Sequence, residues 1–597
     1  MSMPTYDLKP SIDVKGCGVA SSGYGAIIQR VRGALACREK ELPEMEARSS
    51  VLTIECYPGT NYGELLPELI APLGPSLVLC ADDYAWDSDR LQSRIRDVIT
   101  DDRIFGVMSH YEVADFYDED SIAAARQRVE RAIAGDLNGP IVVYGVGASL
   151  IAPDGILVYA DLTRWEITLR YRSGACNWKT HNADEDPLRK IKRGYFFEWR
   201  IADRLKCDVY QNIDFLMETN TPGEPTMVDG DSYRAALALA ATRPFRLVPY
   251  FDESVWGGQW MKERFKLDPS KKNYGWAFDG VPEENSIILS FEGASVEIPA
   301  INMVLHEPDS LLGAQVRARY GAEFPIRFDF LDTMGGGNLS LQVHPRTEYI
   351  QRVFGMTYTQ DESYYILDAT DESKVFLGVR SDTTKEELVA DLMTAAGGVP
   401  FPIEKHVNVF PVKKHDHVSI PSGTIHCSGA NTVVLEISAT PYNFTFKLWD
   451  WGRLGLDGRP RPINIGHGEP NILMERNTEF CDRELISRAG EEHANLSDQK
   501  GVKTEKTGLH GLESIETRRH WFEERVVIDC HESVNMLNLV EGTEVEVRSV
   551  DGSFEPMTIH YAETFIVPEC VQSYCIVNRN PGVRAAVLQA FIRNPRA

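Results

Sequence analysis

The chain has 597 residues, of which 43% are hydrophobic and 25% charged, a composition typical of a globular protein with about three to four domains. Its 88 acidic and 62 basic side chains give a formal net charge of −26, which repels polyanions, so we expect no nucleic-acid partner. No stretch approaches the ~18 apolar residues of a membrane span and no secretory signal is visible, so we expect no membrane partner.

The cysteines indicate a reducing environment. All 11 occur singly, and their odd number without any CxxC pair argues against both a disulfide framework and a zinc ribbon. We therefore expect the protein in the cytoplasm.

Residues 1–215 alternate short apolar runs with amphipathic, charged segments. The predicted strands are Val51–Cys56, Ser76–Cys80, Ile141–Tyr144 and Ile156–Ala160, and the predicted helices include Asp87–Thr100 and Ser121–Ala134. Buried strands that alternate with helices favour a parallel α/β sheet.

A Pro-, Gly- and Thr-rich stretch separates this alternating pattern from a pattern of short β-type runs, and we expect a linker at residues 216–243. Residues 244–490 carry short β-branched and aromatic runs, which predict an all-β sandwich or barrel. These runs are Ser286–Phe291, Ile326–Leu331, Val375–Val379, His417–Ile420 and Thr432–Ile437. A second polar linker, 491–515, precedes a small β-domain at 516–597.

The segment NLSLQVHP, residues 338–345, carries the first part of a candidate metal site. Alternate side chains of a strand share one face, so Gln342 and His344 project together, with Ser340 one step before them. An imidazole and an amide at i and i+2 can hold one metal ion from a single strand.

Two further segments complete the pattern. Glu362 begins the apolar run DESYYILDA, and the turn PSGTIH delivers His426 to the start of another strand. Each residue taken singly is more often structural, but two His, one Glu and one Gln together make a nitrogen and oxygen site that suits Zn²⁺ and tolerates Mn²⁺ or Fe²⁺.

Residues 246–467 resemble the type I phosphomannose isomerases of the cupin superfamily. The matching segments are VPYFDESVWGGQWMKERF (248–265), NLSLQVHP (338–345), DESYYILDA (361–369), IPSGTIHCSG (420–429) and FKLWDWGRLGLDGRPRP (446–462), with ETFIVPECVQSY (563–574) in the family's second, non-catalytic cupin. The resemblance implies a catalytic jelly-roll cupin at 244–490, a cupin-like domain at 516–597, and Gln342, His344, Glu362 and His426 as metal ligands.

The resemblance also implies the chemistry. The family interconverts mannose 6-phosphate and fructose 6-phosphate through a cis-enediol, which implies a sugar phosphate as the small-molecule partner. Glu436 is the implied acid/base, with an outward charge on a half-buried strand as the alternative. Lys447 is the implied cation near the enediolate, and Ser340 a phosphate ligand or a structural hydroxyl.

Two residues depart from the family pattern. Lys447 stands where the family usually has Arg, and Gln360 where it often has Lys. The interval from Glu436 to Lys447 is also one residue longer. A cupin that has lost turnover and serves as a sugar-phosphate-binding regulator is therefore the alternative function.

Residues 141–172 and the basic run 188–206 resemble uridine or nucleoside kinases of the P-loop class. The phosphate-binding lysine of GxxxxGK[ST] is missing from both Gly-rich segments, 16–25 and 143–150. We expect a non-catalytic scaffold, with retained nucleotide or sugar binding, or a bifunctional sugar kinase and isomerase, as alternatives. The basic run is interpreted as a solvated helix face.

Overall fold

The structure is a computed structural model that describes residues 6–41, 51–135, 139–440, 442–491, 493–508, 511 and 513–594. The chain divides into two compact units. The N-terminal unit comprises Ser11–Ala240 with Ser286–Asn302, and the barrel unit comprises Met1–Pro10, Ala241–Asn285 and Met303–Ala597. Among the described residues, no helix is long and apolar enough to cross a membrane.

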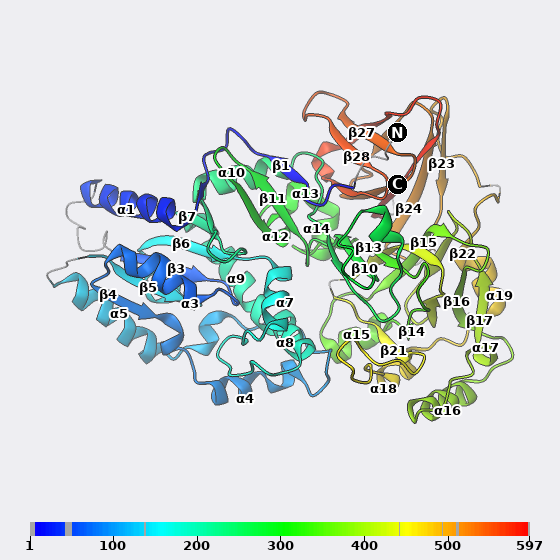
Figure 1. The fold of residues 1–597 in the computed structure, drawn as a ribbon, viewed down its shortest axis with the longest axis horizontal. Helices are drawn as coiled ribbons and strands as arrows, with labels where there is room; N and C mark the ends of the chain where they lie inside the picture. Colours follow the sequence, from blue (N-terminus) through cyan, green and yellow to red (C-terminus); the bar gives the residue numbers. More distant parts are fainter. Residues whose placement is uncertain are drawn as a thin grey trace. The chain divides into compact units, whose positions relative to one another are not determined.

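The N-terminal unit is built on a mainly parallel sheet of seven strands (Figure 1). In spatial order the strands are β2 (Ser21–Ser22), β8 (Thr226–Asp229), β7 (Phe215–Glu218), β6 (Ile156–Asp161), β3 (Val51–Cys56), β5 (Ile141–Gly145) and β4 (Leu77–Cys80). β8 is antiparallel to its neighbours β7 and β2, and the other pairs are parallel. The predicted parallel sheet and its four predicted strands are confirmed.

Helices cover both faces of this sheet. The described helices of the unit are α1 (Tyr24–Glu41), α3 (Tyr62–Leu65), α4 (Ser88–Ile99), α5 (Glu119–Ile133), α6 (Ala148–Ile151), α7 (Arg164–Arg172), α8 (Pro187–Arg193), α9 (Trp199–Val209) and α10 (Gly230–Ala240). Ile27 and Val31 of α1 pack on one face, and Ala125 and Val129 of α5 pack on the other. The two predicted helices correspond to α4 and α5.

Two segments differ from the expected organisation. Residues 216–243, expected to be a linker, contain most of β7 and all of β8 and α10. Ser286–Phe291, expected in the barrel, instead belongs to the N-terminal unit, where β11 (Ser286–Ser290) pairs with β1 (Ser11–Asp13) and β12 (Ser295–Pro299). An apolar β-run shows the same local pattern whichever sheet it joins, because partner choice is a long-range property.

The basic run 188–206 was interpreted as a solvated helix face, and this interpretation is wrong. Lys190, Lys192 and Arg193 are all buried. Lys190 Nζ donates to the carbonyl oxygens of Ala175 (3.0 Å) and Tyr171 (3.4 Å), and Arg193 Nε donates to Glu198 Oε1 at 2.7 Å. These charges stay buried because carbonyl dipoles and one carboxylate replace their hydration.

Charged side chains at the carboxyl edge of the parallel strands pair with one another. Arg164 Nη2 donates to Asp203 Oδ2 at 2.5 Å, and Tyr57 OH donates to Asp203 Oδ1 at 2.9 Å. Beside them, Lys206 Nζ donates to Asp161 Oδ2 at 2.8 Å. This edge is where open α/β sheets bind ligands, and here the protein's own ion pairs occupy it.

Replacing Asp203 with Asn is expected to destabilise the N-terminal unit by about 3–5 kcal/mol, because it leaves the buried Arg164 without its counter-charge. Burial raises the pKa of Asp203, but Arg164 and Arg200 outweigh burial and lower it. The ion pair therefore stabilises the unit above the unfolded-state pKa of Asp, and this stability is lost as the pH falls through the lower folded-state pKa. Hydrogen exchange in β3 and β6 measures the effect.

The matched control is Asp231→Asn, which removes an exposed partner of Arg234 at 2.6 Å and is expected to change stability by less than about 1 kcal/mol. Equal exchange rates in the two variants would contradict a structural role for the buried pair.

The barrel unit contains two facing antiparallel sheets. The larger consists of β22 (Ile486–Ser487), β18 (His417–Ile420), β15 (Asp361–Ala369), β20 (Thr432–Ala439), β13 (Arg327–Asp332), β10 (Trp276–Gly280) and β9 (Tyr250–Asp252). The smaller consists of β17 (Val407–Pro411), β16 (Lys374–Val379), β19 (His426–Ser428), β14 (Leu341–Val343) and β21 (Phe446–Trp449). The expected all-β architecture of antiparallel sheets is confirmed.

Short helices connect the strands. They are α11 (Trp260–Arg264), α13 (Pro308–Leu312), α14 (Ala314–Tyr320), α15 (Thr347–Phe354), α16 (Lys385–Ala396), α17 (Ile403–His406), α18 (Ile465–Gly468) and α19 (Thr478–Phe480), while α12 (Ile301–His306) joins the two units in sequence. The expected all-β domain is therefore supplemented by helices in its loops.

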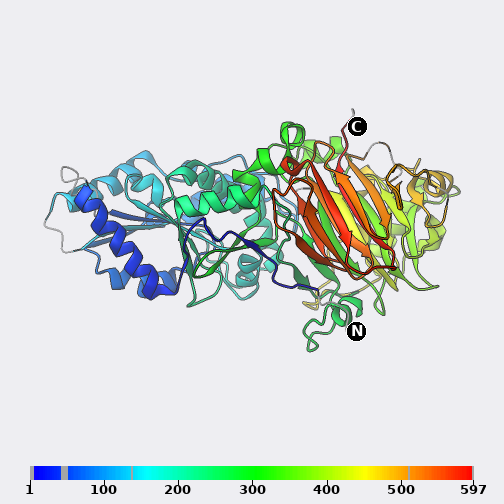
Figure 2. The same cartoon turned by 90° about the horizontal axis from the view of Figure 1, so that it is seen from above.

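A second pair of sheets follows within the same unit, and its orange to red strands lie side by side in Figure 2. One sheet has the order β23 (Val502–Lys506), β24 (Ile515–Phe522), β31 (Ala585–Ile592), β26 (Asn535–Glu541) and β29 (Thr564–Val567), and the other β25 (Arg525–Asp529), β30 (Ser573–Asn578), β27 (Glu544–Ser549) and β28 (Met557–His560). Residues 491–515, expected to be a linker, include β23.

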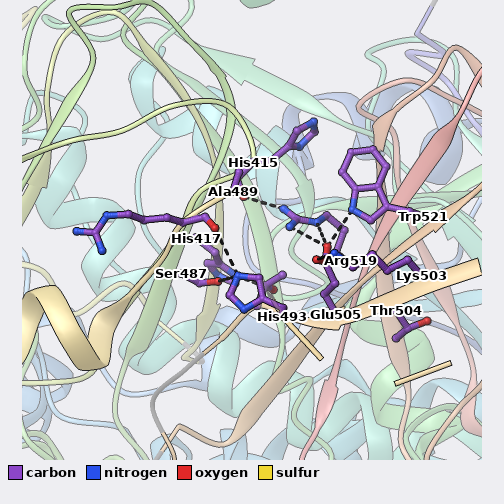
Figure 3. A network of polar contacts seen from close by, with 12 residues as sticks. His415, His417, Ser487, Ala489, His493, Lys503, Thr504, Glu505, Arg519 and Trp521 are labelled. Atoms are coloured by element: carbon purple, nitrogen blue, oxygen red, sulfur yellow. Dashed lines mark hydrogen bonds and ion pairs between the residues drawn. The ribbon is translucent and has the colours of Figure 1, made fainter. Parts of the chain in front are cut away.

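A buried polar network joins the second pair of sheets to the first (Figure 3). Arg519 of β24 donates from Nη2 to Glu505 Oε2 (3.0 Å) and from Nη1 to the carbonyl oxygen of His415 (2.7 Å) and the hydroxyl of Tyr365 (3.2 Å). Tyr365 lies on β15, on the face opposite to Glu362. The second pair of sheets is therefore hydrogen-bonded to β15, the strand that carries the candidate metal ligand Glu362.

Candidate metal centre

The four predicted metal ligands come together from both sheets. Gln342 of β14 lies directly opposite His426 of β19, and His344 follows Gln342 on the same face. Glu362 comes from β15 of the facing sheet. All four side chains are buried, and ligand atoms of His344, Glu362 and His426 lie within 4.8 Å of one another.

The ring orientations of both histidines are set by backbone carbonyls. Nδ1 of His344 donates to the carbonyl oxygen of Phe444 at 3.0 Å, and Nδ1 of His426 donates to that of Thr424 at 2.9 Å. A carbonyl can only accept, so Nδ1 of each ring carries a proton, and a neutral imidazole at either position has its lone pair on Nε2. Gln342 Nε2 lies 3.2 Å from Nε2 of His426.

The donor set fits a divalent cation. Nε2 of His344 lies 2.6 Å from Oε2 of Glu362, and within the described residues neither this nitrogen nor Oε1 of Glu362 forms a hydrogen bond. A nitrogen lone pair so close to a carboxylate oxygen is repulsive unless positive charge lies beside both atoms. Two imidazole nitrogens and a carboxylate are the ligands that Zn²⁺, Mn²⁺ and Fe²⁺ share.

The charge state of Glu362 agrees with such a site. Burial raises the pKa of Glu362, but positive charge on His344 and His426 outweighs burial and lowers it. When the imidazoles are neutral ligands, the cation takes over that role.

The turn that delivers His426 is held by the other ligand segments. Asp361 Oδ1 accepts from the backbone N–H of Ser422 at 2.9 Å, and the N–H of Gly423 donates to the carbonyl oxygen of His344 at 3.0 Å. Gly423 has φ +85°, and a Cβ there would lie 2.7 Å from Leu473 Cδ1, so only glycine suits this position. The turn PSGTIH therefore contacts the segments that carry His344 and Glu362, and it leads directly into His426.

Glu436 lies on the inner face of the larger sheet, which excludes an outward-facing charge. It is directly opposite Tyr364 of β15 and Asp329 of β13, and Tyr364 shares its face with Glu362. Glu436 is 7% exposed and Asp329 2%. Burial raises the pKa of Glu436, and the charges of Asp329 and Glu362 raise it further.

The other two predicted residues lie near the metal ligands. Lys447 of β21 is directly opposite Gln342 and is partly exposed. Ser340 is buried, two residues before Gln342.

Two residues of this centre were missed as functional candidates. Asp329 lies in an alternating strand, RFDFLD, which signals an inward carboxylate but not its pairing with Glu436. Gln360 was noted only as a missing lysine, yet its side chain contacts Glu362.

Comparison with known proteins gives one family match and several curated relatives. A family described as a domain of unknown function, DUF8485, matches residues 23–242. The chain is 26% identical over 227 residues to mannose-6-phosphate isomerase ManA of Bacillus subtilis, covering 38% of this chain and 66% of that protein. It is 27% identical over 224 residues to mannose-6-phosphate isomerase of Streptococcus mutans, covering 37% and 65%.

The curated relatives are mannose-6-phosphate isomerases. The chain spans about two thirds of their length, 65–66% for the two named here. Among solved structures, mannose 6-phosphate isomerase from Bacillus subtilis matches with a TM-score of 0.47 and 19% identity, covering 59% of this chain and 100% of that chain. A mannose 6-phosphate isomerase bound with zinc and yttrium matches with a TM-score of 0.43 and 15% identity, covering 59% and 100%. At these TM-scores the likeness assigns neither substrate nor metal.

Proposed function

We propose that the barrel unit is a metal-dependent aldose–ketose isomerase that interconverts mannose 6-phosphate and fructose 6-phosphate, or a related sugar phosphate, through a cis-enediol. The observation that carries the proposal is the convergence of His344, Glu362 and His426 on the inner side of the barrel that also holds Glu436. The relatives named mannose-6-phosphate isomerase support the same reaction class.

Each residue has a role that its position allows. His344, Glu362 and His426, with the amide of Gln342 beside them, would hold the ion, for which Zn²⁺ is our first choice. When bound, such an ion stabilises negative charge on the C1 and C2 oxygens of the substrate.

The protein's own acid/base group is Glu436, whose buried carboxyl would carry the proton between C1 and C2. Burial and the neighbouring carboxylates raise the pKa of this carboxyl, which is the direction that favours a group able to hold the transferred proton. Lys447 would place positive charge near the enediolate, and Ser340 would offer a hydroxyl to the phosphate.

We also propose that the N-terminal unit is a non-catalytic scaffold. The turn after the interior strand β3, Tyr57–Asn61, contains no lysine, and Glu64 accepts hydrogen bonds from Tyr24 OH (2.9 Å) and the N–H of Gly223 (2.7 Å). ATP consumption that depends on a free sugar would contradict this proposal and favour a bifunctional sugar kinase and isomerase.

The decisive experiment is to incubate metal-replete protein with mannose 6-phosphate and to measure fructose 6-phosphate. We expect turnover that is lost on chelation and restored by Zn²⁺, Mn²⁺ or Fe²⁺. Tight metal binding without turnover of any hexose phosphate would contradict the isomerase and favour a sugar-phosphate-binding regulator.

Replacing Asp329 with Asn is expected to move the acidic limb of the pH–rate profile by about one pH unit towards lower pH. The charge of Asp329 raises the pKa of Glu436, so its removal lowers that pKa. A base must be deprotonated, and activity falls as the pH drops through its pKa. The measurement is kcat/KM against pH, with the pair treated as one coupled system.

The matched control is Asp368→Asn, on the same strand as Glu362, which removes the negative charge of the group that accepts from the Trp260 indole N–H. An unchanged profile in the Asp329 variant would show that Glu436 does not titrate in the reaction.

A further inference from the structure

Gln360 lies directly before β15 and is buried against two segments of the metal centre. Its Nε2 donates to Oε2 of Glu362 at 3.0 Å. Its Oε1 accepts from the backbone N–H of Phe444 at 3.0 Å. One amide thus uses its donor and its acceptor on two different partners.

These contacts form part of a closed circuit. The carbonyl oxygen of Phe444 accepts from Nδ1 of His344 at 3.0 Å, and Nε2 of His344 lies 2.6 Å from Oε2 of Glu362. The path from Gln360 through Glu362, His344 and Phe444 therefore returns to Gln360. Within this circuit, Gln360 sets the orientation of the Glu362 carboxylate, and the carbonyl of Phe444 sets that of the His344 imidazole.

We propose that Gln360 is a positioning residue that holds both Glu362 and His344 in the geometry for binding a divalent metal ion, the first directly and the second through the backbone of Phe444. The inference rests on the proposed metal site. The amide occupies Oε2 of Glu362, whereas Oε1 has no hydrogen bond within the described residues and stays available to the ion. Partners that orient metal ligands change metal affinity by about 10- to 100-fold.

Only a glutamine side chain satisfies both contacts at this length. Glutamate accepts from Phe444 but, when ionised, has no hydrogen to donate to Glu362. Lysine donates but cannot accept, and methionine has no donor and only a weakly accepting sulfur. Compared with lysine, glutamine at position 360 therefore fixes the orientation of Glu362 and of the Phe444 backbone together.

The test measures the dissociation constants of Zn²⁺ and Co²⁺ by chelator competition for the full chain and for Gln360→Glu and Gln360→Met. Both variants are expected to bind about 10- to 100-fold more weakly, with an altered d–d spectrum of bound Co²⁺. Gln360→Met adds no charge and serves if Gln360→Glu does not fold. Unfolding of the metal-free proteins is followed in parallel, because a merely structural role would change it without changing the Co²⁺ spectrum.

The matched control is Gln351→Glu, in α15, where Nε2 donates to the carbonyl oxygen of Thr357 at 3.1 Å on an exposed surface. It is expected to keep the affinity and spectrum of the unchanged protein. Affinity and spectrum retained in both Gln360 variants would overturn the inference. An unchanged protein that binds neither ion would instead overturn the metal site itself.

Discussion

Replacing His344 with alanine is expected to abolish isomerase activity and to weaken metal binding by more than about 100-fold, the upper range for residues that only orient ligands. His344 supplies one of two imidazole nitrogens, and its loss leaves the buried Glu362 without its 2.6 Å neighbour. Loss of the ion removes several kcal/mol of transition-state stabilisation, which corresponds to about a thousandfold or more in rate.

Metal content and kcat/KM on mannose 6-phosphate measure the effect together. His531→Ala is the matched control, because His531 lies in the turn between β25 and β26, 3.5 Å from Asp529 and away from the metal ligands in the sequence of strands. If the His344 variant held no metal and was still as active as the unchanged protein, the proposed metal centre would be contradicted.

Replacing Glu436 with Gln is expected to lower kcat by about 10²- to 10⁴-fold, the usual contribution of a positioned acid/base group. Glutamine has nearly the same shape but cannot accept the proton that moves between C1 and C2. Metal affinity should stay within about threefold, because Glu436 is not among the clustered ligands. Exchange of the C2 hydrogen with deuterium in the solvent follows the proton-transfer step directly.

Glu541→Gln is the control for this substitution, since Glu541 pairs with Lys414 at 2.6 Å in the polar network outside the barrel interior. A Glu436 variant with normal kcat would assign the proton transfer to another group. A variant that lost its metal would show that Glu436 supports the centre and is not its acid/base.

Local pattern was sufficient for much of the fold and for the faces on which the predicted ligands lie. Continuous apolar runs such as Val51–Cys56 and Ile156–Ala160 predict buried parallel strands, because such strands are covered on both faces. The spacing of Gln342 and His344 places both on one face of β14, because strand side chains alternate. Which residues hold an ion remains a prediction.

The remaining features depend on contacts between residues far apart in the chain. Asp329 and Glu436 are neighbours only because β13 pairs with β20 in one particular register, and a shift of one strand by one residue would place the two carboxylates on opposite faces of the sheet. The basic run around Lys190 looks solvated until carbonyl groups from other segments surround its ammonium group.

Gln360 shows the same limit most directly. In the sequence it is a neutral residue at a position where the family often has lysine. Its contact with Phe444 cannot be predicted from the local sequence, because Phe444 lies 84 residues away. Residue type and strand period thus determine which side chains can share a face. Sheet register and hydrogen-bond closure, which local sequence does not encode, decide which of them meet.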